Sequence, residues 1–314
     1  MPTLRLGTRG SALALWQSRH VADRLKVAHA GLIIEEIVIQ TEGDRQNAPP
    51  LSDPADRGVF VRRIEEALIE GRIDLAVHSL KDLPTVEPRG LVIAAVPRRH
   101  DARDAVVTVL GLELGELPSG AVLGTASPRR RCQLLHSRPD LTTAPVTGNV
   151  DTRVRKLAEG RFDALVLALA GIERLGITGV GVKPLSTSVC LPAVGQGALA
   201  VETRESDSTT RGMVAFLADD STTRAVSAER SFLRRLGGGC LAPATAFARV
   251  EAGRIRIEAV VGEPDGQRLL RDWAEGESTR GDALGDAIAA RLLDAGAGEI
   301  LAGIRGAAGS EGSA

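Results

Sequence analysis

Hydrophobic and polar positions follow two different periods in the first part of the chain. Short apolar runs rich in β-branched residues, such as residues 33–39, are typical of strands. Apolar side chains spaced by three or four positions, as at Phe60, Ile64 and Leu68, are typical of helices. Strands that alternate with helices indicate right-handed βαβ units around a largely parallel sheet. The strands are predicted at 3–9, 33–39, 73–77 and 91–96, and a helix capped by Ser11 is predicted after the first of them.

A second region with the same alternation follows the polar break at residues 98–101, which we interpret as a domain boundary. Ser127 and Pro128 are suited to the cap and the first turn of a helix, and another helix is predicted to start near Asn149. The Gly- and Pro-rich residues 191–198 are predicted to be a hinge. Strands are predicted at 105–109, 121–124, 164–169 and 199–202.

The C-terminal part of the chain is predicted to be a small α+β domain. A helix from Thr222 leads to a loop at 236–243, and strands at 244–250 and 255–261 and a helix at 282–293 follow. Residues 306–314 are small and polar, which predicts a flexible tail. The polar residues 41–58 are long for a loop, so we expect that segment to be mobile or functional.

Composition narrows the class of protein. A length of 314 residues with 43% hydrophobic and 25% charged residues suits a soluble protein of two or three domains. A net charge of −1 and 2% aromatic residues disfavour nucleic-acid binding. The sequence predicts no membrane span and no secretory signal, so we expect a cytoplasmic protein, and we expect a monomer. Three widely spaced cysteines and five histidines predict neither disulfides nor a metal site.

Cys240 stands directly after three consecutive glycines, which favour a turn or a loop over a helix or strand interior. A thiol on a loop is open to attack or to attachment of another group. The alternative interpretation is a buried or incidental loop cysteine.

Several arginines lie just past a predicted strand or in the first turn of a predicted helix. Each of them alone is most simply a solvated surface charge. Together they predict a polar cleft for a ligand with several carboxylates or phosphates, because guanidinium groups bind such anions in bidentate fashion. No phosphate-binding loop of the G-x-x-x-x-G-K-[ST] type is present. These arginines are Arg9, Arg129, Arg130, Arg153 and Arg174.

Asp82 is the one acid in the turn that follows the strand at 73–77. It is either a simple turn residue or helix cap, or a functional carboxylate. A carboxylate among arginines stays ionised and can stabilise a cation that forms in a reaction. The sequence therefore predicts a site for an anionic substrate that passes through a positive intermediate.

Six separate motifs stand out along the chain, at residues 7–17, 78–84, 124–134, 148–153, 192–198 and 237–243. Together they make the chain resemble the porphobilinogen deaminase family, also called hydroxymethylbilane synthase. The resemblance implies a transferase of tetrapyrrole and heme biosynthesis with one dipyrromethane cofactor, bound to Cys240 through a thioether. It implies that four porphobilinogen molecules are added head to tail, that each releases ammonia, and that hydrolysis frees the linear tetrapyrrole hydroxymethylbilane.

The resemblance also implies roles for individual residues. Asp82 matches the catalytic aspartate, which holds pyrrole N–H groups and stabilises an azafulvene-type cation. Residues implied to bind the acidic groups of the cofactor are Lys81, Ser127, Arg129, Arg130 and Arg153. Residues implied for the substrate side of the cleft are Arg9, Ser11 and Arg174, with Thr125, Asn149 and Gln196 as further polar positions.

The implied fold is α/β, with two similar lobes of the bilobed periplasmic-binding-protein type, mostly parallel sheets and a small C-terminal α+β domain. Lobe 1, for substrate and catalysis, is expected at 1–97 with 198–215. Lobe 2, for the cofactor carboxylates, is expected at 103–191, and the domain that carries the cysteine at 220–305. A hand-over of product to uroporphyrinogen-III synthase is a further expectation.

The chain departs from the family at Thr147, where an arginine is usual, and at Leu241, where polar residues are common. Loss of a guanidinium at residue 147 predicts weaker binding of one carboxylate, with Arg131 or Arg155 as possible replacements. Two other classes remain open. One is a non-catalytic bilobed anion-binding protein, which has no need of Cys240, and the other is a cysteine-nucleophile acyltransferase with His78 as its base.

Overall fold

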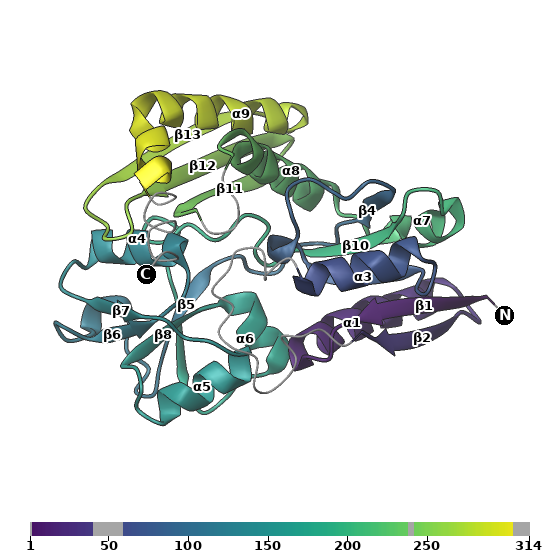
Figure 1. The fold of residues 1–314 in the computed structure, drawn as a ribbon, viewed down its shortest axis with the longest axis horizontal. Coiled ribbons are helices and arrows are strands. Elements are labelled where there is room, and N and C mark those ends of the chain that lie inside the picture. Colours follow the sequence, from purple (N-terminus) through teal and green to yellow (C-terminus); the bar gives the residue numbers. More distant parts are fainter. Residues whose placement is uncertain (1, 40–58, 238–241, 304–314) are drawn as a thin grey trace, which may run out of the picture. The chain divides into compact units, whose positions relative to one another are not determined.

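The computed structural model describes residues 2–39, 59–237 and 242–303 (Figure 1). The chain divides into two compact units, and each is built from two separate segments. The first unit contains residues 1–100 and 197–223, and the second contains residues 101–196 and 224–314. The segment 41–58, Cys240, Leu241 and the tail 306–314 lie outside the described residues.

The first unit contains a five-stranded sheet with the order β2-β1-β3-β10-β4. Strand β1 is parallel to β2 and β3, whereas β10 is antiparallel to both of its neighbours, β3 and β4. The strands are β1 (Thr3–Thr8), β2 (Ile33–Val38), β3 (Leu75–Ser79), β4 (Leu91–Ala95) and β10 (Leu199–Arg204).

Two helices cover this sheet because alternate apolar residues point to opposite faces. Helix α1 (Ala12–Ala28) packs Leu25 against Leu6 and Leu75, whereas α3 (Val59–Ile69) packs Ile64 with Ala76 in a separate cluster. The short helix α7 (Ser208–Val214) follows β10. Ser11 caps α1 as predicted: its hydroxyl accepts a hydrogen bond from the Ala14 N–H at 3.3 Å.

The second unit contains a five-stranded sheet with the order β7-β6-β8-β5-β9. Strand β6 is parallel to β7 and β8, and β5 is antiparallel to β8 and β9. The strand directions and their order therefore repeat those of the first sheet, with the antiparallel strand in fourth place. The strands are β5 (Asp104–Thr108), β6 (Val122–Gly124), β7 (Thr142–Ala144), β8 (Ala164–Ala168) and β9 (Gly181–Pro184).

Helices also cover both faces of the second sheet. Helix α4 (Pro128–Ser137) contributes Leu134 to one cluster, and α5 (Val150–Ala158) and α6 (Leu169–Leu175) contribute Leu157 and Ile172 to the other. Ser127 caps α4 and Pro128 occupies its first turn, as the sequence predicts.

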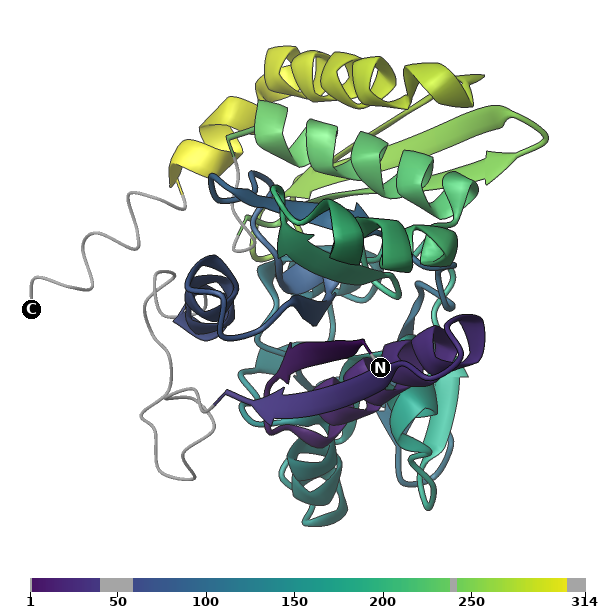
Figure 2. The ribbon, with the colours of Figure 1, turned by 90° about the vertical axis from the view of Figure 1, so that its right-hand side faces the viewer.

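The rest of the second unit is an antiparallel sheet with the order β11-β12-β13. Helices α8 (Asp220–Arg235) and α9 (Gly281–Leu292) cover one face of this sheet (Figures 1 and 2). Gly285 allows the close approach of α9 to α8, because a Cβ at this position would lie 2.3 Å from the carbonyl oxygen of Ala228. The strands are β11 (Ala244–Glu251), β12 (Arg254–Gly262) and β13 (Leu269–Glu277).

The fold class expected from the sequence is confirmed: two similar, mostly parallel sheets and a small C-terminal α+β part. Each large sheet has one antiparallel strand, β10 or β5, because the chain enters that strand from the other unit's segment and not through a helix of its own sheet. Strands β9 and β13 and helices α6 and α7 were not predicted. No helix in the described ranges is long and apolar enough to cross a membrane.

Candidate active site

Asp82 and Lys81 lie on a turn at the carboxyl end of β3. The strand leads directly into a short 3-10 helix, η2 (Leu80–Asp82). Leu80 and Leu83 are buried, and the Leu80 N–H donates a 3.1 Å hydrogen bond to the Ala198 carbonyl. These apolar anchors leave Asp82 exposed and Lys81 partly buried. The turn thus presents a carboxylate and an ammonium group at the surface of the first unit.

Arg9 and Ser11 lie at the same edge of the first sheet. They follow β1, which is parallel and adjacent to β3, so the carboxyl ends of the two strands meet. Arg9 is partly buried. Gln17 of α1 donates a 2.8 Å hydrogen bond from Nε2 to the hydroxyl of Ser79, the last residue of β3. The predicted convergence of Arg9 with the Lys81–Asp82 turn at one sheet edge is confirmed.

In the second unit, three of the predicted site residues donate hydrogen bonds to one carboxylate, Asp104, which the sequence analysis missed. Asp104, at the start of β5, is fully buried. Its Oδ2 accepts from Arg129 Nη1 at 2.7 Å, and its Oδ1 accepts from Arg130 Nη2 at 2.7 Å. Gln196 Nε2 donates to the same Oδ1 at 2.8 Å and to the Ala102 carbonyl at 2.7 Å.

Arg129 and Arg130 are therefore not solvated surface charges. They are 5% and 7% exposed, and Arg130 also donates to the Val166 carbonyl. Burial alone would raise the pKa of Asp104, but the two guanidinium groups hold it well below its usual range. Asp104 in turn raises the pKa of Arg129 against the opposing effect of burial. Two cations against one anion leave this buried cluster with a net positive charge.

The remaining polar candidates of the second unit lie around the starts of α4 and α5. Thr125 is buried, and its hydroxyl accepts a 3.2 Å hydrogen bond from the Ser127 N–H. Asn149 occupies the N-cap position of α5 without a side-chain cap bond and is exposed. Arg153 is partly buried and donates from Nε to the Gly148 carbonyl at 2.7 Å. Both helices begin at carboxyl ends of parallel strands, β6 and β7, so these groups share one edge of the sheet.

Thr147 lies next to a lysine and not to the arginines named from the sequence. Lys156 Nζ lies 3.1 Å from the Thr147 carbonyl and 3.4 Å from its hydroxyl. Arg155 is 70% exposed and pairs with Glu159 at 3.7 Å. Lys156 is therefore the cation that the structure places beside the unusual threonine.

Arg174 is buried in the last turn of α6, which follows β8. Arg174 therefore lies at the end of a helix, whereas the sequence analysis expected it just past a strand. Burial lowers the pKa of Arg174 to about 10, against the opposing charge of Glu173. A carboxylate bound to this guanidinium would favour its charged form.

The two cysteines in the described part of the chain are poor candidates for chemistry. Cys132 and Cys190 are completely buried, and burial raises the pKa of each thiol to about 12. A buried, protonated thiol is a weak nucleophile. Among the described residues no cluster of side chains could hold a metal ion. The burial of Cys132 and Cys190 leaves Cys240 as the cysteine to test.

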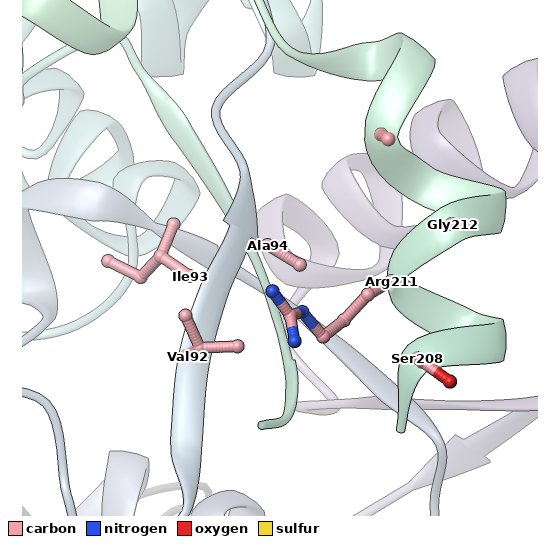
Figure 3. A pocket seen from close by; sticks show the side chains of 7 residues that line it. Val92, Ile93, Ala94, Ser208, Arg211 and Gly212 are labelled. Carbon is pink, nitrogen blue, oxygen red and sulfur yellow. The ribbon is translucent and has the colours of Figure 1, made fainter. Parts of the chain in front are cut away.

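A surface hollow of about 420 Å³ lies in the first unit between β4 and α7. Arg211 extends from α7 toward Val92 and Ala94 of β4, and Ser208 is the first residue of the same helix (Figure 3). None of the predicted site residues lines this hollow. We therefore place the candidate active site at the strand ends described above.

Two family descriptions match the chain. "Porphobilinogen deaminase, dipyromethane cofactor binding domain" covers residues 4–212, and "Porphobilinogen deaminase, C-terminal domain" covers residues 223–294. A porphobilinogen deaminase from Syntrophus aciditrophicus is 47% identical over 95% of this chain and 97% of its own length. One from Roseiflexus sp. is 48% identical over 96% of this chain and 99% of its own length.

Solved structures add only a distant likeness. The effector-binding domain of BenM, with benzoate, is 16% identical, covers 68% of this chain and 89% of its own length, and has a TM-score of 0.42. The sequence matches extend over nearly the whole chain and include every described site residue. The chain belongs to the porphobilinogen deaminase family.

Proposed function

We infer that this chain is a hydroxymethylbilane synthase. It joins four porphobilinogen molecules head to tail on a covalently bound dipyrromethane, releases four ammonia, and frees hydroxymethylbilane by hydrolysis. The observation that carries this conclusion is the match of both family regions, 4–212 and 223–294, in one chain. We propose Cys240 as the residue that bears the cofactor.

The residues of the second unit fit a ligand with acetate and propionate groups. The net positive charge of the Arg129–Arg130–Asp104 cluster lies beneath the start of α4, and the α4 and α5 N-termini add backbone N–H donors. We propose that Ser127, Arg129, Arg130 and Arg153 hold the cofactor's carboxylates, together with Lys81. When bound, the cofactor supplies the pyrrole carbon to which the first substrate is joined.

The residues of the first unit fit the reacting ring of the substrate. We propose that the exposed carboxylate of Asp82 accepts hydrogen bonds from pyrrole N–H groups and stabilises the cation that porphobilinogen forms when ammonia leaves. Arg9 and Ser11 at the same sheet edge would bind the substrate's carboxylates. From the second unit, Arg174 would also bind them, and Thr125, Asn149 and Gln196 complete the proposed set, although Gln196 also hydrogen-bonds to Asp104.

We propose a division into three domains: lobe 1 at 1–97 and 198–215, lobe 2 at 103–191 and the cysteine domain at 220–305. The break between the two family regions supports the start of the cysteine domain, and the two separate five-stranded sheets support the division between the lobes. We propose a cytoplasmic monomer. We also propose that its product passes to uroporphyrinogen-III synthase.

Intact-mass spectrometry tests the proposed function. The purified chain is expected to be heavier than its sequence by one dipyrromethane, and Cys240→Ala is expected to lose that adduct. Incubation with porphobilinogen should release ammonia and form a uroporphyrinogen-type product. A chain that binds porphobilinogen without turnover and carries no adduct would instead be an anion-binding protein.

A further inference from the structure

Three buried titratable side chains lie beneath the carboxyl end of β3, outside the proposed site. His78 Nε2 is 3.0 Å from Glu202 Oε2, and the two side chains are only 6% and 1% exposed. Glu65 of α3 is also buried, and its Oε1 has no hydrogen-bond partner among the described residues. Glu202 pairs across the sheet with Ala76, two residues before His78, so both side chains lie on the face that α3 covers.

The surroundings of Glu65 favour its protonated form. A buried carboxylate costs several kcal/mol unless a partner neutralises it. Burial raises the pKa of Glu65, and so do the charges of Glu202 and Glu66, against the opposing charges of His78 and Arg62. Glu65 therefore holds its proton more tightly than an ordinary glutamate, whereas Glu202 makes its contact with His78.

The His78–Glu202 contact joins β3 to β10 just before the turn that carries Asp82. Asp82 follows His78 by four residues in the sequence. Beyond this contact, the register continues with Ser79 opposite Leu199 and with the hydrogen bond from Leu80 to Ala198. A slip of β3 along β10 would therefore move the carboxylate of Asp82.

We propose that His78 and Glu202 are positioning residues that fix the Lys81–Asp82 turn for catalysis. The proposal rests on the proposed role of Asp82. Because both residues are buried, their loss should lower kcat and leave KM nearly unchanged. A misplacement of about 1 Å costs on the order of 100-fold in rate.

The test compares Glu202→Leu, Glu202→Gln and the double variant His78→Leu/Glu202→Leu. Glu202→Leu should lower kcat by ~10- to 100-fold with KM within about twofold. Glu202→Gln keeps an oxygen that accepts from His78, so it should retain kcat within about threefold. The double variant removes both members of the contact, so neither His78 nor Glu202 is left buried without its partner, and it should fold even where Glu202→Leu does not.

Hydrogen–deuterium exchange of the peptide 75–83 provides a readout that does not depend on activity. Amide exchange at Leu80 and Leu83 should be faster in the Leu variants than in wild type, because their hydrogen bonds lie next to the lost contact. His29→Gln is the matched control, since His29 contacts the Met213 carbonyl at 2.8 Å in the same unit but away from β3. It should change neither kcat nor exchange at 75–83.

Normal kcat in the folded double variant would overturn the proposal, as would unchanged exchange at residues 75–83. Equal losses in Glu202→Gln and Glu202→Leu would also contradict it, because the hydrogen bond would then not be what positions the turn. If wild-type protein does not turn over porphobilinogen, the proposed function fails, and the exchange measurement still decides whether His78 and Glu202 hold the turn.

Discussion

The two five-stranded sheets share one strand order but surround their buried carboxylates differently. Each sheet carries a buried acid on its antiparallel fourth strand, Glu202 on β10 and Asp104 on β5. Asp104 contacts two guanidinium groups, whereas Glu202 contacts one imidazole and has Glu65 nearby. The same topology therefore supports a cluster of two guanidinium groups around one carboxylate in one unit, and a histidine–glutamate contact in the other.

This difference matches the proposed division of labour. Guanidinium groups stay charged at every physiological pH, so the second unit is suited to hold a growing chain of carboxylates. The first unit presents an exposed Asp82 next to the buried His78–Glu202 contact. Each of the following variants tests one side of this comparison.

Asp82→Asn should have the largest effect, on turnover. Removal of the negative charge leaves no anion on the turn to stabilise the cation, so we expect a loss of ~100- to 1000-fold in kcat. The dipyrromethane adduct should remain. Activity assays and intact masses check both statements. A normal rate would show that the cation-stabilising role of Asp82 is wrong.

Asp104→Asn should have the next largest effect, on stability. Two buried guanidinium groups would lose their anion, and breaking a buried pair in this way costs about 3–5 kcal/mol. Urea unfolding measures the loss. Asp101→Asn is the control, because Asp101 and Arg103 form a partly exposed pair, with side chains 32% and 44% accessible, worth about 1 kcal/mol or less. Equal unfolding midpoints for the two variants would contradict the role of Asp104.

Lys156→Gln should raise the KM for porphobilinogen about tenfold. Its ammonium lies beside Thr147, and loss of a hydrogen bond to a charged group costs about 1.5–3 kcal/mol. Arg155→Gln, one residue earlier on α5, should change KM by less than about twofold, because Arg155 pairs with Glu159.

Thr147→Arg should leave activity unchanged or raise it. A large loss in Thr147→Arg would mean that this part of the site is arranged differently.

Glu65→Gln should have the smallest effect and should depend on pH. The pKa of Glu65 is raised in the folded protein from 4.5, so its proton stabilises the fold at low pH. That contribution is lost as the pH rises through the folded value. Glutamine imitates the protonated acid, so the variant should exceed wild type in urea resistance at pH 8, by about 1 kcal/mol or less, and match it near pH 4.5. Glu70→Gln, at an exposed position just after α3, is the control. A constant difference between pH 4.5 and pH 8 would contradict the raised pKa.

Local signals in the sequence predicted most of the fold. Ser11 and the Ser127–Pro128 pair mark helix starts by side-chain chemistry that acts within a few residues, and both predictions are confirmed. Strand β13 was missed because charged residues such as Arg271 and Glu275 occupy its exposed positions, and only its partner β12 makes it a strand. The antiparallel strands β5 and β10 also depend on where a distant segment of the chain returns.

The candidate site was only partly predictable for the same reason. Strand ends located Arg9 and Asp82, because parallel neighbours bring their carboxyl ends together. Asp104 carried no local signal, since its partners Arg129 and Arg130 are some 25 residues away in sequence. The two arginines can be buried because Asp104 pairs with both of them, and only the tertiary structure reveals this pairing. The placement of Lys156 beside Thr147 depends on side-chain reach along α5.

The most direct test of the account is the intact mass of the wild-type chain after brief exposure to limiting porphobilinogen. The account predicts a main species that exceeds the 32.9 kDa sequence by one dipyrromethane, together with heavier species separated by one pyrrole unit each. Asp82→Asn should show the main species without the heavier series. A wild-type mass equal to that of the bare sequence, with or without substrate, would contradict the central claim.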